Sequence, residues 1–281
     1  MGNLILIHGG VGSKGRNKED MLGIAGKCIS SDALDTVVKA VVMLEDDPRF
    51  NAGTGSVIRI DGTIQMDAAV SIPGSFGAVI NIERVKNPIL VARDVMEKTP
   101  HIALSGRGAK LFARKMGYTE YDPSTDQARE NYVKMKDALL GKTGDEDRYK
   151  EMKRLIELGY VDEPHDTVGA VARVGGKFAA AVSTGGASPM MPGRVGDVPL
   201  IGAGIYCGEN GAVVATGYGE EIAKHLLCYR IYSKIGQKPL KNILMEEIDA
   251  FNGKLAGVIS VSKDEFSFMS NGVMGTDLME F

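Results

Sequence analysis

The stretch YVDEPHDTVGAVARVGG, residues 160–176, decides how the rest of the chain is interpreted. Its second half, Val168 to Val174, is apolar at nearly every position, which predicts a strand buried on both faces. Its first half is polar, contains Pro164, and ends a charge-rich segment that begins near Lys142. A loose polar tether therefore meets a rigid buried strand at Thr167.

This stretch alone leaves two interpretations of Thr167 open. Thr is common in strands, so Thr167 can simply be the first strand residue. Alternatively it is a nucleophile: an N-terminal threonine carries its own base, an α-amine with a reference pKa near 7.7–8.0. That second interpretation requires the Asp166–Thr167 bond to be cut. The Thr167 hydroxyl can attack the carbonyl of Asp166, and water can then hydrolyse the ester.

The composition of the 281 residues, 44% hydrophobic and 25% charged, predicts a soluble globular protein. A net charge of -3 without a basic stripe argues against a nucleic-acid partner. We find no signal peptide and expect no membrane partner. Cys28, Cys207 and Cys228 are odd in number and far apart, which favours a reduced, cytoplasmic compartment.

Strands and helices are expected in both halves of the chain, on either side of the charged segment. Strands that follow one another, rather than alternating singly with helices, indicate an α+β layered fold. Strands are expected at 3–8, 77–82, 167–174, 178–184, 211–217, 256–263 and 266–271, with a hairpin at 56–68 around Asp61-Gly62. Helices are expected from Ser31, at 88–98, 106–117, 220–234 and 240–251, and before Gly159.

A dinucleotide-binding fingerprint, G-x-G-x-x-G, matches Gly10, Gly12 and Gly15. That fingerprint needs a helix that begins within the glycines and a second strand that ends in an acidic residue. Here a polar loop follows the glycines, and Asp32 stands at a helix start. A dinucleotide-dependent oxidoreductase is therefore the weaker alternative.

Longer motifs surround Thr167 in the order HGGVG (8–12), FNAGTGSV (50–57), STGG (183–186), PGRVGDVPLIGAG (192–204) and ATGYGE (215–220). Together they resemble the plant-type L-asparaginase and isoaspartyl aminopeptidase family of N-terminal-nucleophile (Ntn) hydrolases. The segments 67–79 and 87–113 match the same family. The resemblance covers nearly the whole chain and is weakest between Tyr118 and Glu163.

The resemblance implies a single Ntn-hydrolase domain, residues 1–281, with a four-layer αββα sandwich of two antiparallel sheets between helical layers. It implies autocatalytic cleavage between Asp166 and Thr167, into an α chain 1–166 and a β chain 167–281. The two chains are expected to pair into an (αβ)2 heterotetramer. No cofactor is expected for catalysis. A structural sodium ion is implied on the backbone of Leu44, Glu45, Asp47, Phe50, Ala52 and Thr54.

The same resemblance assigns the site residues. Thr167 matches the nucleophile, and Thr184 matches the threonine that hydrogen-bonds it. Thr216 and the Gly217 N–H match the oxyanion hole, whose donors meet charge that develops in the transition state. The remaining matches are with residues that bind or border the substrate: Arg194 for its α-carboxylate, Asp197 for its α-amine, and Asn51 and Gly219.

The expected activity is hydrolysis of L-asparagine to aspartate and ammonia, and of β-aspartyl dipeptides. Two alternatives stay open: a glycosylasparaginase-like hydrolase, and an unprocessed relative that binds amino acids without turnover. Asp166 in "HDT" is typical of glycosylasparaginases, whereas "STGG" is typical of asparaginases. Tyr218 and residues 187–191 depart from the family pattern, and we expect them to admit small leaving groups and crowd a glycan.

Overall fold

The protein is described by a computed structural model that covers residues 2–12, 21–140 and 167–281. These residues form two β-sheets and eight helices, which confirms a mixed α+β fold. The helix expected before Gly159, together with Asp166 and Gly15, lies outside the described residues. The chain ends meet, because the Phe281 N–H donates to the Asn3 carbonyl at 3.0 Å.

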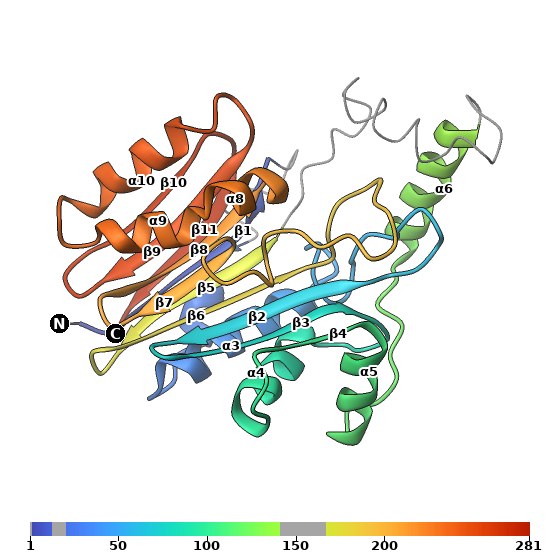
Figure 1. The fold of residues 1–281 in the computed structure, drawn as a ribbon, viewed down its shortest axis with the longest axis horizontal. Coiled ribbons are helices and arrows are strands. Elements are labelled where there is room, and N and C mark those ends of the chain that lie inside the picture. The colour runs from blue at the N-terminus through green and yellow to red at the C-terminus, as the bar shows by residue number, and fades with distance from the viewer. Residues whose placement is uncertain (1, 13–20, 141–166) are drawn as a thin grey trace.

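Seven strands form the larger sheet (Figure 1). Their order is β11 (Met274–Glu280), β1 (Leu4–Val11), β5 (Val168–Val174), β6 (Lys177–Thr184), β2 (Met66–Ile72), β3 (Ser75–Ile82) and β4 (Ala103–Ser105). Neighbours are antiparallel except β3 and β4, which are parallel. The expectation of purely antiparallel sheets is therefore wrong at this edge. The reason is that a helix, α4 (Pro88–Lys98), connects β3 to β4 as a crossover.

Strands β5 and β6 lie at the centre of this sheet, and every residue of β5 is buried. The predicted strand after Thr167 is thereby confirmed. Gly175 and Gly176, with φ of 58° and 75°, make the tight turn that joins β5 to β6. The antiparallel register places Val168 opposite Ser183, so the start of β5 and the end of β6 lie side by side.

The smaller sheet has four antiparallel strands in the order β10 (Phe266–Ser270), β9 (Ala256–Ser262), β8 (Gly211–Gly217) and β7 (Ile205–Gly208). It packs against β1, β2, β5 and β6 of the larger sheet. The packed side chains are apolar, among them Leu6, Val171 and Val182 from one sheet and Val214 and Ile259 from the other. Burial of this interface holds β8 against β5, where a Cβ added at Gly169 would lie 3.0 Å from the Val214 side chain.

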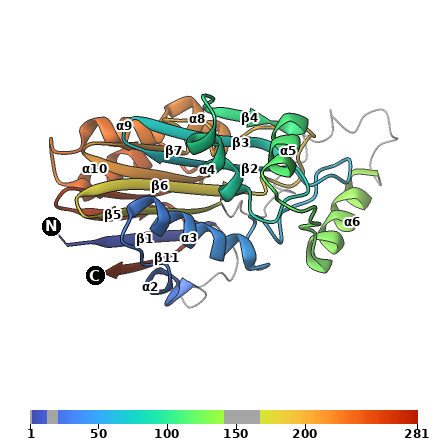
Figure 2. The same cartoon turned by 90° about the horizontal axis from the view of Figure 1, so that it is seen from below.

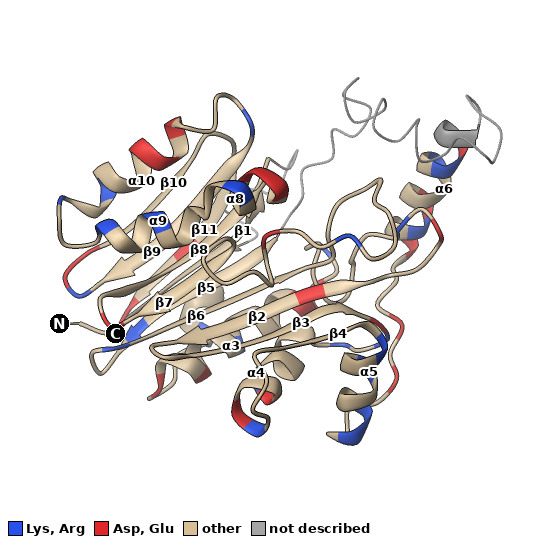
Figure 3. Cartoon of the chain, viewed as in Figure 1, with Lys and Arg blue, Asp and Glu red and all other residues tan. Residues whose placement is uncertain are grey.

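Helices cover the outer face of each sheet. Figure 2 shows α3 (Ala33–Asp46) and α4 against the larger sheet, and α9 (Leu227–Lys234) and α10 (Leu240–Asp249) pack on the smaller one. The other helices are α2 (Ile24–Lys27), α5 (Gly106–Lys115), α6 (Asp126–Leu140) and α8 (Gly219–His225). Figure 3 shows charged residues mainly on helices and loops. Within the described residues, no helix is both long and apolar enough to span a membrane.

Two of the expected elements were also wrong. The hairpin at 56–68 does not form, because strand structure begins only at Met66. The single helix at 220–234 is two helices, separated by Leu226 in a left-handed conformation with φ of 50°. The dinucleotide fingerprint, already the weaker alternative on sequence grounds, also lacks its structural context, because Gly10 lies inside β1, which is antiparallel to both of its neighbours.

Candidate active site

Thr167 and Thr184 lie in hydrogen-bonding contact at the adjoining ends of β5 and β6. The Oγ1 of Thr167 donates to the Oγ1 of Thr184 at 3.3 Å, and both residues are buried. Thr184 Oγ1 also accepts the Gly186 N–H at 3.0 Å. A hydroxyl that already accepts a backbone bond has a fixed orientation, so Thr184 holds the Thr167 hydroxyl in one direction.

Asn51 secures the turn that follows Thr184. Its side-chain amide donates to the Gly186 carbonyl at 2.6 Å, and its own carbonyl accepts the Gly185 N–H at 2.8 Å. Its Oδ1 accepts the Val57 N–H at 3.0 Å. A Cβ at Gly185 would lie 2.2 Å from Asn51 Oδ1, so only glycine fits there. Asn51 therefore holds the Gly185–Gly186 turn directly after Thr184.

Arg194, Asp197 and Gly219 come together at a second point. A Cβ added at Gly219 would lie 2.8 Å from Asp197 Oδ1 and 3.0 Å from Arg194 Nη2. The absence of a side chain at Gly219 thus leaves the cation and the carboxylate side by side. A guanidinium and a carboxylate at this spacing can bind the carboxylate and the ammonium of one amino acid.

Glu220 is a residue of this site to which the sequence analysis gave no role. Its carboxylate binds Arg194 through two contacts of 2.9 Å, to Nε and Nη2. Burial lowers the pKa of the Arg194 guanidinium, but the bond to Glu220 and the charges of Glu220, Asp197 and Asp67 together raise it. A ligand carboxylate must therefore compete with Glu220 or bind through Nη1. The sequence feature that could have indicated a role for Glu220 is its place as the last residue of the motif ATGYGE.

Asp197 is a buried acid with an unused oxygen. The residue is 4% exposed, and its Oδ2 has no hydrogen-bond partner among the described residues. Burial raises the pKa of Asp197 to about 7, and Arg194 partly offsets this. A buried acceptor without a partner is destabilising by about 1–3 kcal/mol, which indicates a place for a ligand donor.

Thr216 and Gly217 end β8, directly before Gly219. Thr216 is fully buried, and its Oγ1 has no hydrogen-bond partner in the described part of the chain. Gly217 has a φ of 134°, and a Cβ there would lie 2.3 Å from the Leu255 carbonyl. Only glycine can adopt this backbone conformation without strain. The Thr216 hydroxyl is therefore, like Asp197 Oδ2, a buried polar atom without a partner among the described residues.

His8 lies beside the start of β5 but is poorly suited to act as a base. It pairs with Gly169 across β1 and β5, and a Cβ at Gly169 would lie 2.4 Å from its Nε2. Burial lowers the pKa of His8 to about 3, although a backbone hydrogen bond with Thr167 partly raises it. A group with such a pKa is a weak proton acceptor at neutral pH.

The loop between Leu44 and Thr54 gathers backbone carbonyls. A Cβ at Gly53 would lie 2.5 Å from the Glu45 carbonyl oxygen, and one at Gly55 would lie 2.6 Å from that of Pro48. Phe50 contributes a further carbonyl, 2.9 Å from the same Gly55 position. Carbonyl oxygens are ligands that hard cations accept. The Glu45 and Asp47 carbonyls of this loop already accept the N–H groups of Thr54 and Phe50, and the sodium ion that the resemblance implies stays a prediction.

Comparisons with known proteins agree with one another. The sequence profile of the family described as Asparaginase matches residues 25–271. A plant-type L-asparaginase from Pyrococcus furiosus is 44% identical over 232 residues, covering 78% of this chain and 75% of the relative. An isoaspartyl peptidase/L-asparaginase from Rattus norvegicus is 38% identical, covering 91% and 78%. An isoaspartyl peptidase from Salmonella typhimurium is 37% identical, covering 83% and 75%.

Proposed function

The chain belongs to the asparaginase family and is therefore a hydrolase, and we propose that it cleaves L-asparagine and β-aspartyl dipeptides through Thr167. The observation that carries this proposal is that Asp197 Oδ2 and Thr216 Oγ1 are both buried without a hydrogen-bond partner in the described residues, while Gly219 leaves room beside Asp197 and Arg194. Asp197 can accept hydrogen bonds from an α-ammonium, Thr216 can donate to a developing oxyanion, and Arg194 can pair with an α-carboxylate. An aspartyl unit attached through its side-chain carbonyl carries all three.

The proposed mechanism begins with the free α-amine of Thr167, which takes the proton of its own hydroxyl. The Oγ1 attacks the side-chain carbonyl of the bound aspartyl unit, while Thr184 keeps the hydroxyl oriented. Thr216 Oγ1 and the Gly217 N–H stabilise the oxyanion. The protonated amine then gives its proton to the leaving nitrogen, and ammonia or an amino acid departs. Water, activated by the same amine, hydrolyses the ester and releases aspartate.

This mechanism requires cleavage between Asp166 and Thr167, which leaves an α chain 1–166 and a β chain 167–281. We extend the proposal to one Ntn-hydrolase domain with the four-layer αββα arrangement, assembled as (αβ)2 in the cytoplasm. The packing of a helical layer on the outer face of each sheet supports the four layers. No cofactor enters the reaction. A sodium ion on the 44–54 loop would stiffen the segment that positions Asn51.

A denaturing gel tests the processing step. Wild-type protein is expected to give pieces of about 18 and about 12 kDa, in proportion to their shares of the 30.0 kDa chain. Thr167→Ala is expected to leave one band at 30.0 kDa, because it removes the attacking hydroxyl. Wild-type protein that stays whole while fully active would show that the amine is not the base.

The substrate is tested by comparing kcat/KM for L-asparagine, a β-aspartyl dipeptide and a glycosyl-asparagine on one processed sample. We expect the first two to be cleaved faster, because we propose that Tyr218 and residues 187–191 admit small leaving groups and crowd a glycan. Preference for the glycosyl-asparagine would favour the glycosylasparaginase-like alternative. Binding of L-aspartate without turnover of any substrate would favour an unprocessed binding protein.

A further inference from the structure

Arg59 is the largest fully buried side chain in the described structure. It lies in the segment that was expected to form a hairpin and does not. Burial lowers the pKa of its guanidinium to about 10, so Arg59 is still charged at neutral pH. A buried charge is retained only where several polar groups replace the water it has lost.

Within the described residues, two of the four groups that accept hydrogen bonds from Arg59 belong to the loop that carries Arg194, and the others are the Gln65 carbonyl and Asn81 Oδ1. The Nη1 of Arg59 donates to the Met191 carbonyl at 2.6 Å, and its Nη2 lies 3.1 Å from the Arg194 carbonyl. The neighbouring Ile60 N–H donates to the Met190 carbonyl at 3.1 Å. Three carbonyls between residues 190 and 194 are thus bound by two consecutive residues.

A β-bulge supplies the other side of this arrangement. Met66 pairs with Ile82 and Ala68 with Val79, so β3 carries one extra residue opposite Asp67. The bulge holds Asn81 at a φ of 50°. There its Oδ1 accepts Arg59 Nη2 at 2.8 Å and its Nδ2 donates to the Gly193 carbonyl at 3.2 Å. Asn81 therefore fastens Arg59 and the loop to the sheet together.

Asp67 connects this arrangement to the threonines. It lies opposite Thr184 across β2 and β6, is buried, and accepts the Asn81 N–H at 2.7 Å. Burial raises its pKa to about 6, and the charges of Arg59 and Arg194 lower it in part. Asp67 is therefore ionised at neutral pH, and its negative charge interacts with the guanidinium groups of both Arg59 and Arg194.

We propose that Arg59 is a positioning residue that fixes the 190–194 loop, and through it the guanidinium of Arg194, for the α-carboxylate of the substrate. This inference rests on the proposed function. It predicts that loss of Arg59 weakens binding of the aspartyl unit far more than it slows the chemistry at Thr167. The Thr167–Thr184 pair has no bond to Arg59, whereas the backbone of Arg194 does.

The test compares Arg59→Met with Arg173→Met on processed protein. Arg173 is a matched control: it is buried in β5 and donates to the carbonyls of Gly2 and Ser262, at the end of β5 away from Thr167. Arg59→Met is expected to raise KM for L-asparagine and a β-aspartyl dipeptide about tenfold or more, with kcat changed less than about threefold. Arg173→Met is expected to lower Tm but to leave KM unchanged.

Calorimetric binding of L-aspartate gives a readout that needs no turnover. Its Kd is expected to rise in Arg59→Met by the same factor as KM. In an Arg194→Lys background Arg59→Met is expected to add much less, because the two residues act through one contact with the substrate. Arg59→Lys, which keeps the charge but loses the planar fork, is expected to raise KM by a few-fold only.

Unchanged KM and Kd in both Arg59 variants, or an equal increase in Arg173→Met, would overturn the positioning role. If Arg59→Met does not fold, Arg59→Lys with unchanged KM overturns it as well. Failure of the proposed function looks different: wild-type protein would turn over no aspartyl substrate. A weaker L-aspartate Kd in Arg59→Met would then still support the role of Arg59.

Discussion

At the scale of single residues, Gly219 is the position where the smallest change has the clearest expected effect. Gly219→Ala places a methyl group 2.8 Å from Asp197 Oδ1 and 3.0 Å from Arg194 Nη2, closer than carbon normally approaches. Displacing either group loses a charge-assisted bond to substrate, worth about 1.5–3 kcal/mol. KM should therefore rise by about tenfold to a hundredfold, measured with L-asparagine and a β-aspartyl dipeptide.

Gly108→Ala is the control for this substitution. Gly108 lies in the first turn of α5, has ordinary backbone angles, and has nothing within 4 Å of an added Cβ. Alanine there should leave KM unchanged and stabilise the protein by about 0.5–1 kcal/mol. A Gly219→Ala enzyme with wild-type KM would mean that the substrate does not bind beside this residue.

Asp197 should make substrate binding depend on pH. Burial raises its pKa to about 7, so the carboxyl is increasingly protonated below that pH and can no longer pair with an α-ammonium. The Kd of L-aspartate should therefore rise about tenfold for each pH unit below 7. Calorimetry between pH 5 and 8 measures this, and a flat profile would show that Asp197 does not bind the amine.

Lower pH affects the folding stability in the opposite direction to substrate binding. The folded pKa of Asp197 lies above its ordinary value of 3.8, so the folded state binds the proton more tightly. This residue therefore favours folding at low pH and loses that contribution as pH rises through 7. Weaker binding in acid thus cannot be attributed to unfolding caused by Asp197.

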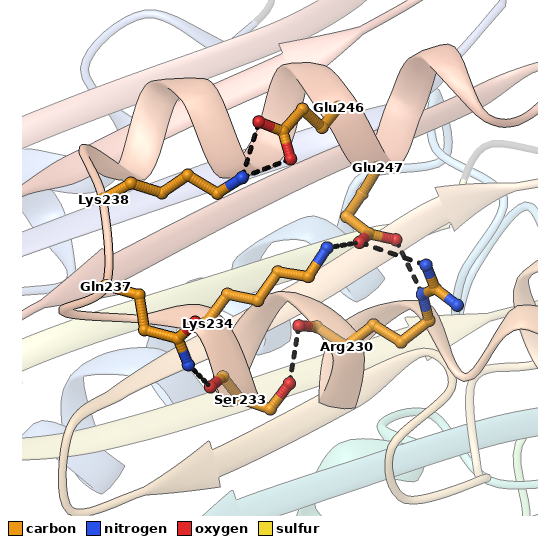
Figure 4. Close-up of polar contacts among 7 residues, drawn as sticks. All are labelled: Arg230, Ser233, Lys234, Gln237, Lys238, Glu246 and Glu247. Carbon is orange, nitrogen blue, oxygen red and sulfur yellow. Dashed lines mark hydrogen bonds and ion pairs between the residues drawn. The ribbon is translucent and has the colours of Figure 1, made fainter.

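At the scale of elements, α9 and α10 are joined by one buried carboxylate in addition to their apolar packing (Figure 4). The Glu247 side chain is 3% exposed and binds Arg230 at 2.8 Å as well as Lys234. Burial raises its pKa, but the bonds to Arg230 and Lys234 outweigh this and lower it. Glu247→Gln should cost about 1–3 kcal/mol of unfolding free energy at pH 7, measured by urea denaturation.

The neighbouring residue provides the control. Glu246 pairs with Lys238, but both side chains are well exposed, at 48% and 35%. Glu246→Gln should change stability by less than about 1 kcal/mol. The Glu247 contribution should disappear as pH falls through its lowered folded pKa, because the carboxylate is then protonated. Equal losses in both variants would mean that burial of Glu247 adds nothing.

Sequence patterns predicted those elements that are decided by residues close together in the chain. The strand after Thr167 is a continuous apolar run, and α4 begins at Pro88 and keeps a helical period. The hairpin failed for a physical reason. Asp61-Gly62 does turn, since the Gly62 N–H donates to the Arg59 carbonyl, but the Ile60 N–H bonds to distant Met190. Turn chemistry is local, whereas strand pairing is not.

In the candidate site, too, some features could be predicted from the sequence, whereas others depend on contacts between distant segments. The resemblance predicted the bond between Thr184 and Thr167, and the structure has it, with Asn51 bound to the turn that follows Thr184. The bond between Arg194 and Glu220 joins residues 26 positions apart, and it depends on how α8 meets the 192–197 loop. No pattern in the sequence specifies that placement.

At the scale of the whole molecule, the proposed cut divides the larger sheet in an interleaved way. In the order β11-β1-β5-β6-β2-β3-β4, strands β11, β5 and β6 belong to residues 167–281 and the others to residues 1–166. Strand β1 lies between β11 and β5, and β2 pairs with β6. Three of the six strand pairings therefore join the two pieces, and neither piece has a complete sheet alone.

This arrangement predicts that cleavage leaves a single cooperative unit. The two pieces should elute together from a gel-filtration column at neutral pH, and they should separate only in denaturant. Thermal unfolding of the processed protein should show one transition, because loss of either piece exposes the apolar faces of β1, β5 and β6. Residues 167–281 expressed alone should lack a stable fold. A folded, monomeric 167–281 fragment, or two separate transitions in the processed protein, would contradict a sheet shared between the pieces.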